Sequence, residues 1–85
     1  MASTWRPDVS SLSFQPPGHA GRCFVHRRAF ATILGFDPTP DDCASTFQQR
    51  RAAFEAAAAA KISRAALAAD ANFHLNSRDI LRAVV

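Results

Sequence analysis

Three histidines and two cysteines are the side chains of this sequence that bind metal ions most readily. His19, Cys23 and His26 are close in sequence, and Cys43 or His74 would have to complete a set of ligands. A structural zinc site holds four such ligands in a tetrahedron and typically draws on a C-x2-C pair, which this sequence lacks. In an extended strand, Cys23 and His26 also point to opposite faces. We therefore predict no metal site and no cofactor, and we interpret the histidines as three unrelated surface residues.

Cys43 is the residue best placed to act as a nucleophile. It lies near the start of a predicted helix, where the positive end of the helix dipole lowers the pKa of a thiol. Asp41 and Asp42 place negative charge beside it, however, and negative charge opposes formation of the thiolate. Cys43 also falls on the apolar stripe of that helix. We interpret it as a buried, unreactive thiol.

The sequence contains no arrangement that predicts catalysis. Hydrolysis needs a nucleophile, a base and an oxyanion donor brought together. Pairs such as His74 with Asp79 arise by chance in a chain with three histidines and seven acidic residues. The G-x-S-x-G, P-loop and H-E-x-x-H motifs are absent, and 85 residues leave little volume for a closed pocket. We expect a protein that is not an enzyme and has no catalytic residues.

Arginine supplies nine of the ten cations in this chain, whose net charge is +3. Arginines around an exposed aromatic ring hold single-stranded nucleic acid by neutralising phosphates and stacking bases. Such a nucleic-acid or partner face is predicted if the second strand, the first helix and the long helix adjoin, and it comprises Arg22, Phe24, Arg27, Arg28, Arg50, Arg51, Lys61 and Arg64. Alternatively, Phe24 packs under the N-terminal segment and the arginines pair with acids. The motifs of RNP, KH and helix-turn-helix domains are absent.

A hairpin and a short helix are the first elements that would position these residues. Ser11–Phe14 alternates polar and apolar side chains, which is typical of a half-buried strand. A turn rich in Pro and Gly separates it from a second strand, Arg22–His26. Arg27–Leu34 then has the apolar spacing of a short helix, and Gly35 follows where a helix end favours a left-handed residue.

A long helix is predicted from Pro40 to at least Ile62, with its end between Ile62 and Ala69. Thr39 is a suitable N-cap because Asp42 completes a capping box. The side of the helix opposite its apolar stripe is rich in alanine and supplies a predicted helix-packing face of Ala52, Ala56 and Ala60. This face suits a helix of a second copy, but we favour the high helix propensity of alanine as its explanation, because small exposed side chains contribute little burial energy.

The last elements are a third strand and a short helix. Phe73–Leu75 alternates again, and Asn76 caps the final helix with Asp79 at its third position. We thus expect an α+β fold, in which a small antiparallel sheet (a β-hairpin plus a third strand) is packed by one short and one long helix. The predicted core is Leu12, Phe14, Cys23, Val25, Phe30, Ile33, Leu34, Phe47, Phe54, Ile62, Phe73 and Leu75.

Composition sets the class of protein. A content of 48% hydrophobic residues with seven Phe excludes an intrinsically disordered chain. No stretch reaches the roughly 18 apolar residues of a membrane span. The start of the chain lacks the apolar segment of a secretory leader, so we expect a cytoplasmic protein with reduced thiols. We interpret residues 1–10 as a flexible N-terminal arm and residues 11–85 as a single α+β domain.

The order of these elements resembles a known family. Cys23-Phe24-Val25 leads into a helix with Phe30, and the chain continues with the spacing Cys43…Phe47…Arg51…Phe54…Ala58…Ile62, then Phe73-His74-Leu75 and Asp79-Ile80. This pattern resembles the small proteobacterial domain-of-unknown-function family fourteen-eighty-eight. The resemblance implies a single α+β domain with a small antiparallel sheet, and it implies no activity. The family has a small hydroxyl residue as the cap of the first helix, where this chain has His26, a weaker cap.

We therefore expect a non-catalytic interaction module that acts through the alanine-rich helix face or the arm, with an unknown protein partner or a second copy of the chain. The alternative is a weak, largely electrostatic binder of single-stranded nucleic acid or RNA that uses the arginines above.

Overall fold

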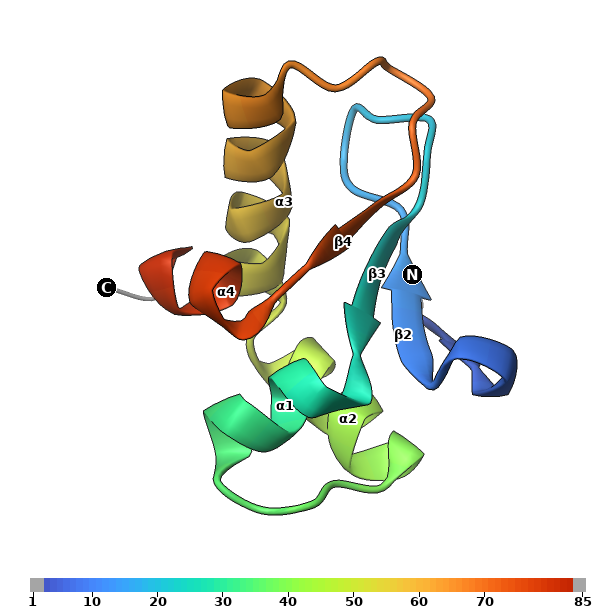
Figure 1. Ribbon diagram of the computed structural model, residues 1–85, viewed down its shortest axis with the longest axis vertical. Coiled ribbons are helices and arrows are strands. Elements are labelled where there is room, and N and C mark those ends of the chain that lie inside the picture. Colours follow the sequence, from blue (N-terminus) through green and yellow to red (C-terminus); the bar gives the residue numbers. More distant parts are fainter. Residues whose placement is uncertain (1–2, 84–85) are drawn as a thin grey trace.

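A computed structural model of the protein describes residues 3–83, so residues 1–2 of the predicted arm and 84–85 of the predicted domain lie outside it. Three strands come first along the chain, and three helices intervene between the third and fourth strands (Figure 1). The elements are β1 (Thr4–Arg6), the 3₁₀ helix η1 (Pro7–Val9), β2 (Ser11–Phe14), β3 (Cys23–His26), α1 (Arg27–Leu34), α2 (Pro40–Gln49), α3 (Arg51–Ala65), β4 (Phe73–Leu75) and α4 (Ser77–Ala83).

The strands form a single mixed sheet in the order β1-β2-β3-β4. β1 pairs with β2 and β2 with β3 in antiparallel fashion, whereas β4 joins β3 in parallel. The predicted α+β fold and the hairpin are confirmed, but the third predicted strand does not extend the sheet in antiparallel fashion. Parallel neighbours need a long crossover, and here α1, α2 and α3 form that crossover, so β4 enters the sheet from the same end as β3.

The sheet gains a strand at the segment that the sequence assigned to an arm. Thr4–Arg6 pairs along β2, and Trp5 lies opposite Leu12. Trp5 is half-buried and packs against the core, which provides the burial that a short polar strand otherwise lacks. η1 and the left-handed residue Ser10 then return the chain into β2. Residues 4–9 of the segment interpreted as an arm therefore form a strand and a 3₁₀ helix at the edge of the sheet.

The predicted long helix is two helices, which is a second correction. The break lies at Arg50, whose φ of −121° and ψ of 30° depart from helical values. A straight helix over residues 40–65 would be about 39 Å long, whereas the longest dimension of the molecule is 33 Å. Bending at Arg50 lets α2 pack against β2 while α3 packs against β4 and α4. α3 ends at Ala65, and Ala66 is left-handed.

The core lies between one face of the sheet and the helices α1–α4 (Figure 1). Most of the predicted core residues are buried, and Ile33, Leu34 and Ile62 are half-buried at its margin. Phe47 and Phe54, on either side of the helix break, contact each other with ring centroids 5.4 Å apart. Within residues 3–83, no helix is both long enough and apolar enough to cross a membrane.

Two local contacts fix the ends of these elements. Thr39 and Asp42 form the predicted capping box at the start of α2, and Gly35 adopts the left-handed conformation after α1. Gly21, just before β3, lies so close to the backbone of Ala71 that a Cβ atom there would overlap the Ala71 carbonyl. The chain segments that lead into β3 and β4 therefore pass each other at this glycine.

Candidate functional site

The sheet face turned away from α1–α4 carries polar, basic and aromatic side chains, and we call it the open face. The strand register places Thr4, Ser13, Phe24 and His74 in one row across the sheet. A second row contains Arg6, Ser11 and His26. Successive side chains of a strand alternate between faces, so these rows follow from the burial of Leu12, Val25 and Leu75 on the other side.

An aromatic pair occupies the centre of the open face. The half-buried Phe24 ring lies beside the exposed His74 ring, with centroids 5.4 Å apart and planes inclined by 30°. The guanidinium carbon of Arg6 lies 5.9 Å from the centroid of Phe24, a cation–π distance. Arg6 of β1 thus covers Phe24. This contact agrees with the alternative interpretation of the sequence, in which Phe24 packs under the N-terminal segment.

Two arginines flank this pair. Arg22 donates from its guanidinium to Ser13 Oγ at 2.8 Å, and its backbone N–H donates to Asn72 Oδ1. Arg6 forms a bidentate ion pair with Asp8 at 2.9 and 3.2 Å, which lowers the pKa of Asp8. Both partners of that pair are exposed, and such pairs contribute little to stability. Arg6 can therefore exchange Asp8 for a phosphate at low energetic cost.

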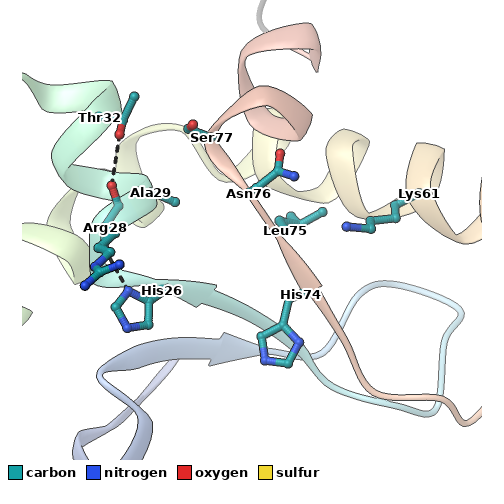
Figure 2. Close-up of a pocket in the computed structure, with 9 residues that line it drawn as sticks. All are labelled: His26, Arg28, Ala29, Thr32, Lys61, His74, Leu75, Asn76 and Ser77. Carbon is teal, nitrogen blue, oxygen red and sulfur yellow. Dashed lines mark hydrogen bonds between the residues drawn. The ribbon is translucent and has the colours of Figure 1, made fainter.

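A cleft of about 470 Å³ lies where the parallel strands β3 and β4 end. Figure 2 shows His26 and His74 projecting to the same side of these strands, with Arg28 beside His26 and Lys61 across the cleft. Ala29 and Leu75, which are buried, form its apolar floor. Its remaining lining residues are Thr32, Asn76 and Ser77. The cleft and the open face share His26 and His74.

His26 has a defined orientation because it caps α1. Its Nδ1 accepts a hydrogen bond from the backbone N–H of Arg28 at 3.0 Å. In the neutral ring the proton is therefore on Nε2, which is left as a donor. The side chain thus satisfies one helical N–H in the same way as the small hydroxyl residue that the family resemblance implies.

The remaining arginines of the predicted face lie apart from Arg22 and Phe24. These cations belong to α1 and α3, or to the junction between α2 and α3, and α1–α3 pack on the other side of the sheet. Most form ion pairs, namely Arg27 with Asp37, Arg51 with Glu55, and Lys61 and Arg64 with Asp79. Arg28 lies at the cleft, and the exposed Arg50 lies between α2 and α3. The structure thus divides the predicted face into separate regions.

Asp79 links α3 and α4. Its carboxylate accepts from Lys61 at 3.0 Å, from Arg64 at 3.1 Å and from the backbone N–H of Asn76 at 3.0 Å. Asn76 Oδ1 in turn accepts from the Asp79 N–H at 2.8 Å, which forms the predicted cap of the last helix. Burial alone would raise the pKa of Asp79, but the Asn76 N–H and the two cations outweigh it, so the pKa lies below its ordinary value.

The alanine-rich face lies on α3. Ala52, Ala56 and Ala60 are exposed, whereas Ala57 and Ala58 are buried. α4 packs against α3, and a hollow of about 140 Å³ between them is lined in part by Ala56, Ala60 and Ala83. A helix of the chain itself therefore already contacts one side of the alanine-rich surface.

The thiols and His19 lie in the interior. Burial raises the pKa of Cys23 to about 12 and that of Cys43 to about 11. His19 is also buried, with Nε2 2.7 Å from the carbonyl of Ala71, so its interpretation as a surface residue is wrong. The loop rich in Pro and Gly folds back onto the Ala71 segment, which the sequence pattern does not show. In the part of the chain that the structure describes, no three potential ligands gather as a metal site would require.

Two site residues missing from the predicted face are Arg6 and His74. Arg6 was missed because β1 was taken as an arm. His74 was placed correctly in a strand between two inward residues, which already directs it outward. What the sequence did not reveal is that β4 lies next to β3, and only this neighbour brings His74 to Phe24.

Comparison with known proteins gives one informative match. No protein-family model matches the chain, and no curated protein matches it either. A crystal structure of a protein of unknown function from the DUF1488 family of Shewanella loihica PV-4 is similar to it with a TM-score of 0.70. The two share 19% sequence identity over 87% of this chain and 85% of that chain. The chain therefore has the fold of a DUF1488 protein, the family (domain of unknown function fourteen-eighty-eight) that its sequence resembles.

Proposed function

We propose that this protein is a non-catalytic interaction module of the DUF1488 kind that binds single-stranded nucleic acid across the open face of its sheet. The observation that carries the proposal is the Phe24–His74 pair, flanked by Arg6 and Arg22 on a face that α1–α4 leave uncovered. Single-stranded nucleic acid was the alternative partner in the sequence analysis. The surface proposed for it is smaller than the face of eight residues that was expected there.

Stacking and charge together favour a single strand over a duplex. A base can stack on the Phe24–His74 pair only if its ring faces are accessible, and in a duplex the neighbouring bases cover them. Arg6 lies over the Phe24 ring, so a stacked base takes the place of its guanidinium, which then joins that of Arg22 in binding the neighbouring phosphates. Ser11 and Ser13, which are buried beneath these side chains, leave the centre of the face without negative charge.

The decisive experiment is a ¹⁵N–¹H correlation titration with a mixed-sequence single-stranded oligonucleotide at low and then moderate salt. The expected result is a set of shifts at Arg6, residues 22–26 and His74 that weakens as salt is added. Phe24→Ala should reduce affinity roughly tenfold, because stacking on an aromatic ring contributes about 1–3 kcal/mol per base.

Leu81→Ala provides a matched control, because Leu81 is an exposed apolar residue of α4 outside the open face. It should leave the affinity unchanged. A spectrum without shifts at any salt would reject nucleic-acid binding. Shifts confined to residues 50–64 would reject the open face as the surface.

A second copy of the chain is the other partner that a specific feature supports. The exposed Ala52, Ala56 and Ala60 adjoin the hollow between α3 and α4, and small side chains allow close approach of a helix. If this face mediates self-association, Ala56→Glu converts a dimer into a folded monomer in sedimentation analysis. A monomeric parent protein would rule this partner out.

We also place the protein in the cytoplasm. Both cysteines are buried and free of disulfides, which suits a reducing compartment. Nothing in this proposal requires catalysis, since the site offers stacking and charge rather than an activated nucleophile.

A further inference from the structure

The cleft at the ends of β3 and β4 continues the open face. His26 and His74 belong to both, and Figure 2 shows their rings projecting together from neighbouring strands. A strand whose terminal nucleotide stacks on Phe24 and His74 would therefore have its end group beside this cleft. The proposal below depends on that placement and thus rests on the proposed function.

Two cations line the cleft. Arg28 lies at its rim, and within residues 3–83 its guanidinium has no ion-pair partner. Lys61 has three N–H donors, of which one binds Asp79. None of the described residues that line the cleft is acidic. Because Lys61 is paired with Asp79, the unpaired positive charge among the described lining residues is that of Arg28.

Neutral donors accompany these cations. Asn76 uses its Oδ1 to accept from Asp79, so its amide NH₂ group is left as a donor in the cleft. Nε2 of His26 is also a donor, because Nδ1 is used in the cap of α1. The Ser77 hydroxyl lies at the same end. Donors thus come from α1, from α3 and from the end of β4.

This set of donors suits a phosphomonoester better than a phosphodiester. A monoester carries a charge of about −1.5 to −2 at pH 7 and has three free oxygens. A diester inside a strand carries one charge, and it has two free oxygens and two chain connections. A volume of about 470 Å³ lies in the range of small-molecule sites and exceeds what a phosphate alone needs. The buried Ala29 and Leu75 can contact the attached sugar.

We propose that the cleft binds the terminal phosphate of the single strand that lies across the open face. Arg28 holds the phosphate oxygens with Nε2 of His26 beside it, and Lys61 and Asn76, on the opposite side of the cleft, add positive charge and further N–H donors. Recognition of this group makes the protein selective for strands with a phosphorylated end. The chemistry is that of a phosphomonoester, and the experiment distinguishes the 5′ end from the 3′ end.

The test compares three versions of one internally labelled mixed-sequence oligonucleotide, with hydroxyl ends, with a 5′-phosphate or with a 3′-phosphate. One of the phosphorylated strands should bind roughly tenfold more tightly than the hydroxyl strand, as charge-assisted hydrogen bonds imply. Arg28→Ala should abolish this gain. Arg50→Ala removes an equally exposed arginine outside the cleft and should preserve it.

The outcomes separate this inference from the proposed function. Equal affinity of all three strands overturns the terminal-phosphate site and leaves the open face intact. If no strand binds, the proposed function fails. Adenosine monophosphate then serves as the probe of the cleft: shifts of the Thr32, Asn76 and Ser77 amides support a phosphomonoester site, and a silent spectrum overturns it.

Discussion

Asp79 combines three roles in one side chain. It is the buried partner of Lys61 and Arg64, and it caps its own helix through Asn76. The Asp79 side chain is 7% exposed, whereas that of Arg64 is 50% exposed. Removing the carboxylate of Asp79 should therefore change the free energy of unfolding more than removing the guanidinium of Arg64. Because Lys61 also lines the cleft, Asp79 positions a cation of the proposed site.

Replacement of Asp79 tests this arrangement. Asp79→Asn keeps the shape of the cap but removes both ion pairs, and it should lower the free energy of unfolding by about 2 kcal/mol in urea denaturation at pH 7. Asp8→Asn, which breaks an exposed pair, should change it by less than about 1 kcal/mol. Equal effects of the two variants would contradict the role of burial.

The pH dependence of stability gives the same residue a second test. The pKa of Asp79 is lowered on folding, so its contribution is present above its unfolded pKa of about 4 and is lost as the pH falls through the folded value. The parent protein should therefore lose more stability than Asp79→Asn between pH 5 and about pH 2. If the free energies of unfolding of the two proteins fell in parallel with pH, the pKa of Asp79 would not be lowered on folding.

The cysteines should be unreactive in the folded protein. Their raised pKa values of about 12 and about 11 leave almost no thiolate at pH 8, and both side chains are buried. Iodoacetamide should modify Cys23 and Cys43 only in molecules that have opened or unfolded, and mass spectrometry follows both sites. Rapid labelling of either thiol in native buffer would show that it is accessible.

Local signals predicted the elements that carry them. His26 and Gly35 bound α1 where the sequence placed its ends, and Thr39 with Asp42 begins α2. These contacts join residues that are close in sequence, so the local sequence pattern is sufficient to predict them. The break at Arg50 has no glycine or proline to mark it, and it lets α2 and α3 pack on different parts of the fold within a molecule whose longest dimension is 33 Å.

The pairing of β4 with β3 depends on a close approach at Gly21. Gly21→Ala should destabilise the protein by more than Gly35→Ala, because the new Cβ overlaps the backbone of Ala71, which has no flexible side chain to move. Gly35→Ala should cost about 1 kcal/mol, the usual cost of a left-handed alanine. Chemical denaturation of both variants measures the difference. A milder effect at Gly21 would mean that the Ala71 segment can shift.

At the scale of the whole molecule, the candidate site was only partly predictable. Phe24 and Arg22 follow from the alternation of β3, which is local. Their neighbours Arg6 and His74 come from the two edge strands, and strand order is decided by packing that periodicity does not encode. The expected continuity with Arg50 and Arg51 failed because the helices cover the other face of the sheet.

Salt dependence of binding tests the proposed set of cations. If Arg6, Arg22 and Arg28 each neutralise one phosphate, log K should fall with log[salt] with a slope of about −2 for a single strand. Arg22→Gln should reduce the slope by about 0.7, and Arg50→Gln should not change it. A slope that responds to Arg50 but not to Arg22 would place the phosphates on the helical side.

The parallel pairing of β3 with β4 also has a consequence for biosynthesis. β3 is complete at His26, but the strand that covers its outer edge begins only at Phe73. Once β3 has left the ribosome, the nascent chain therefore has an open strand edge and an unfinished core until β4 also emerges. Such edges pair readily with other chains. A nascent chain that stalls before β4 would thus be a natural client for chaperones.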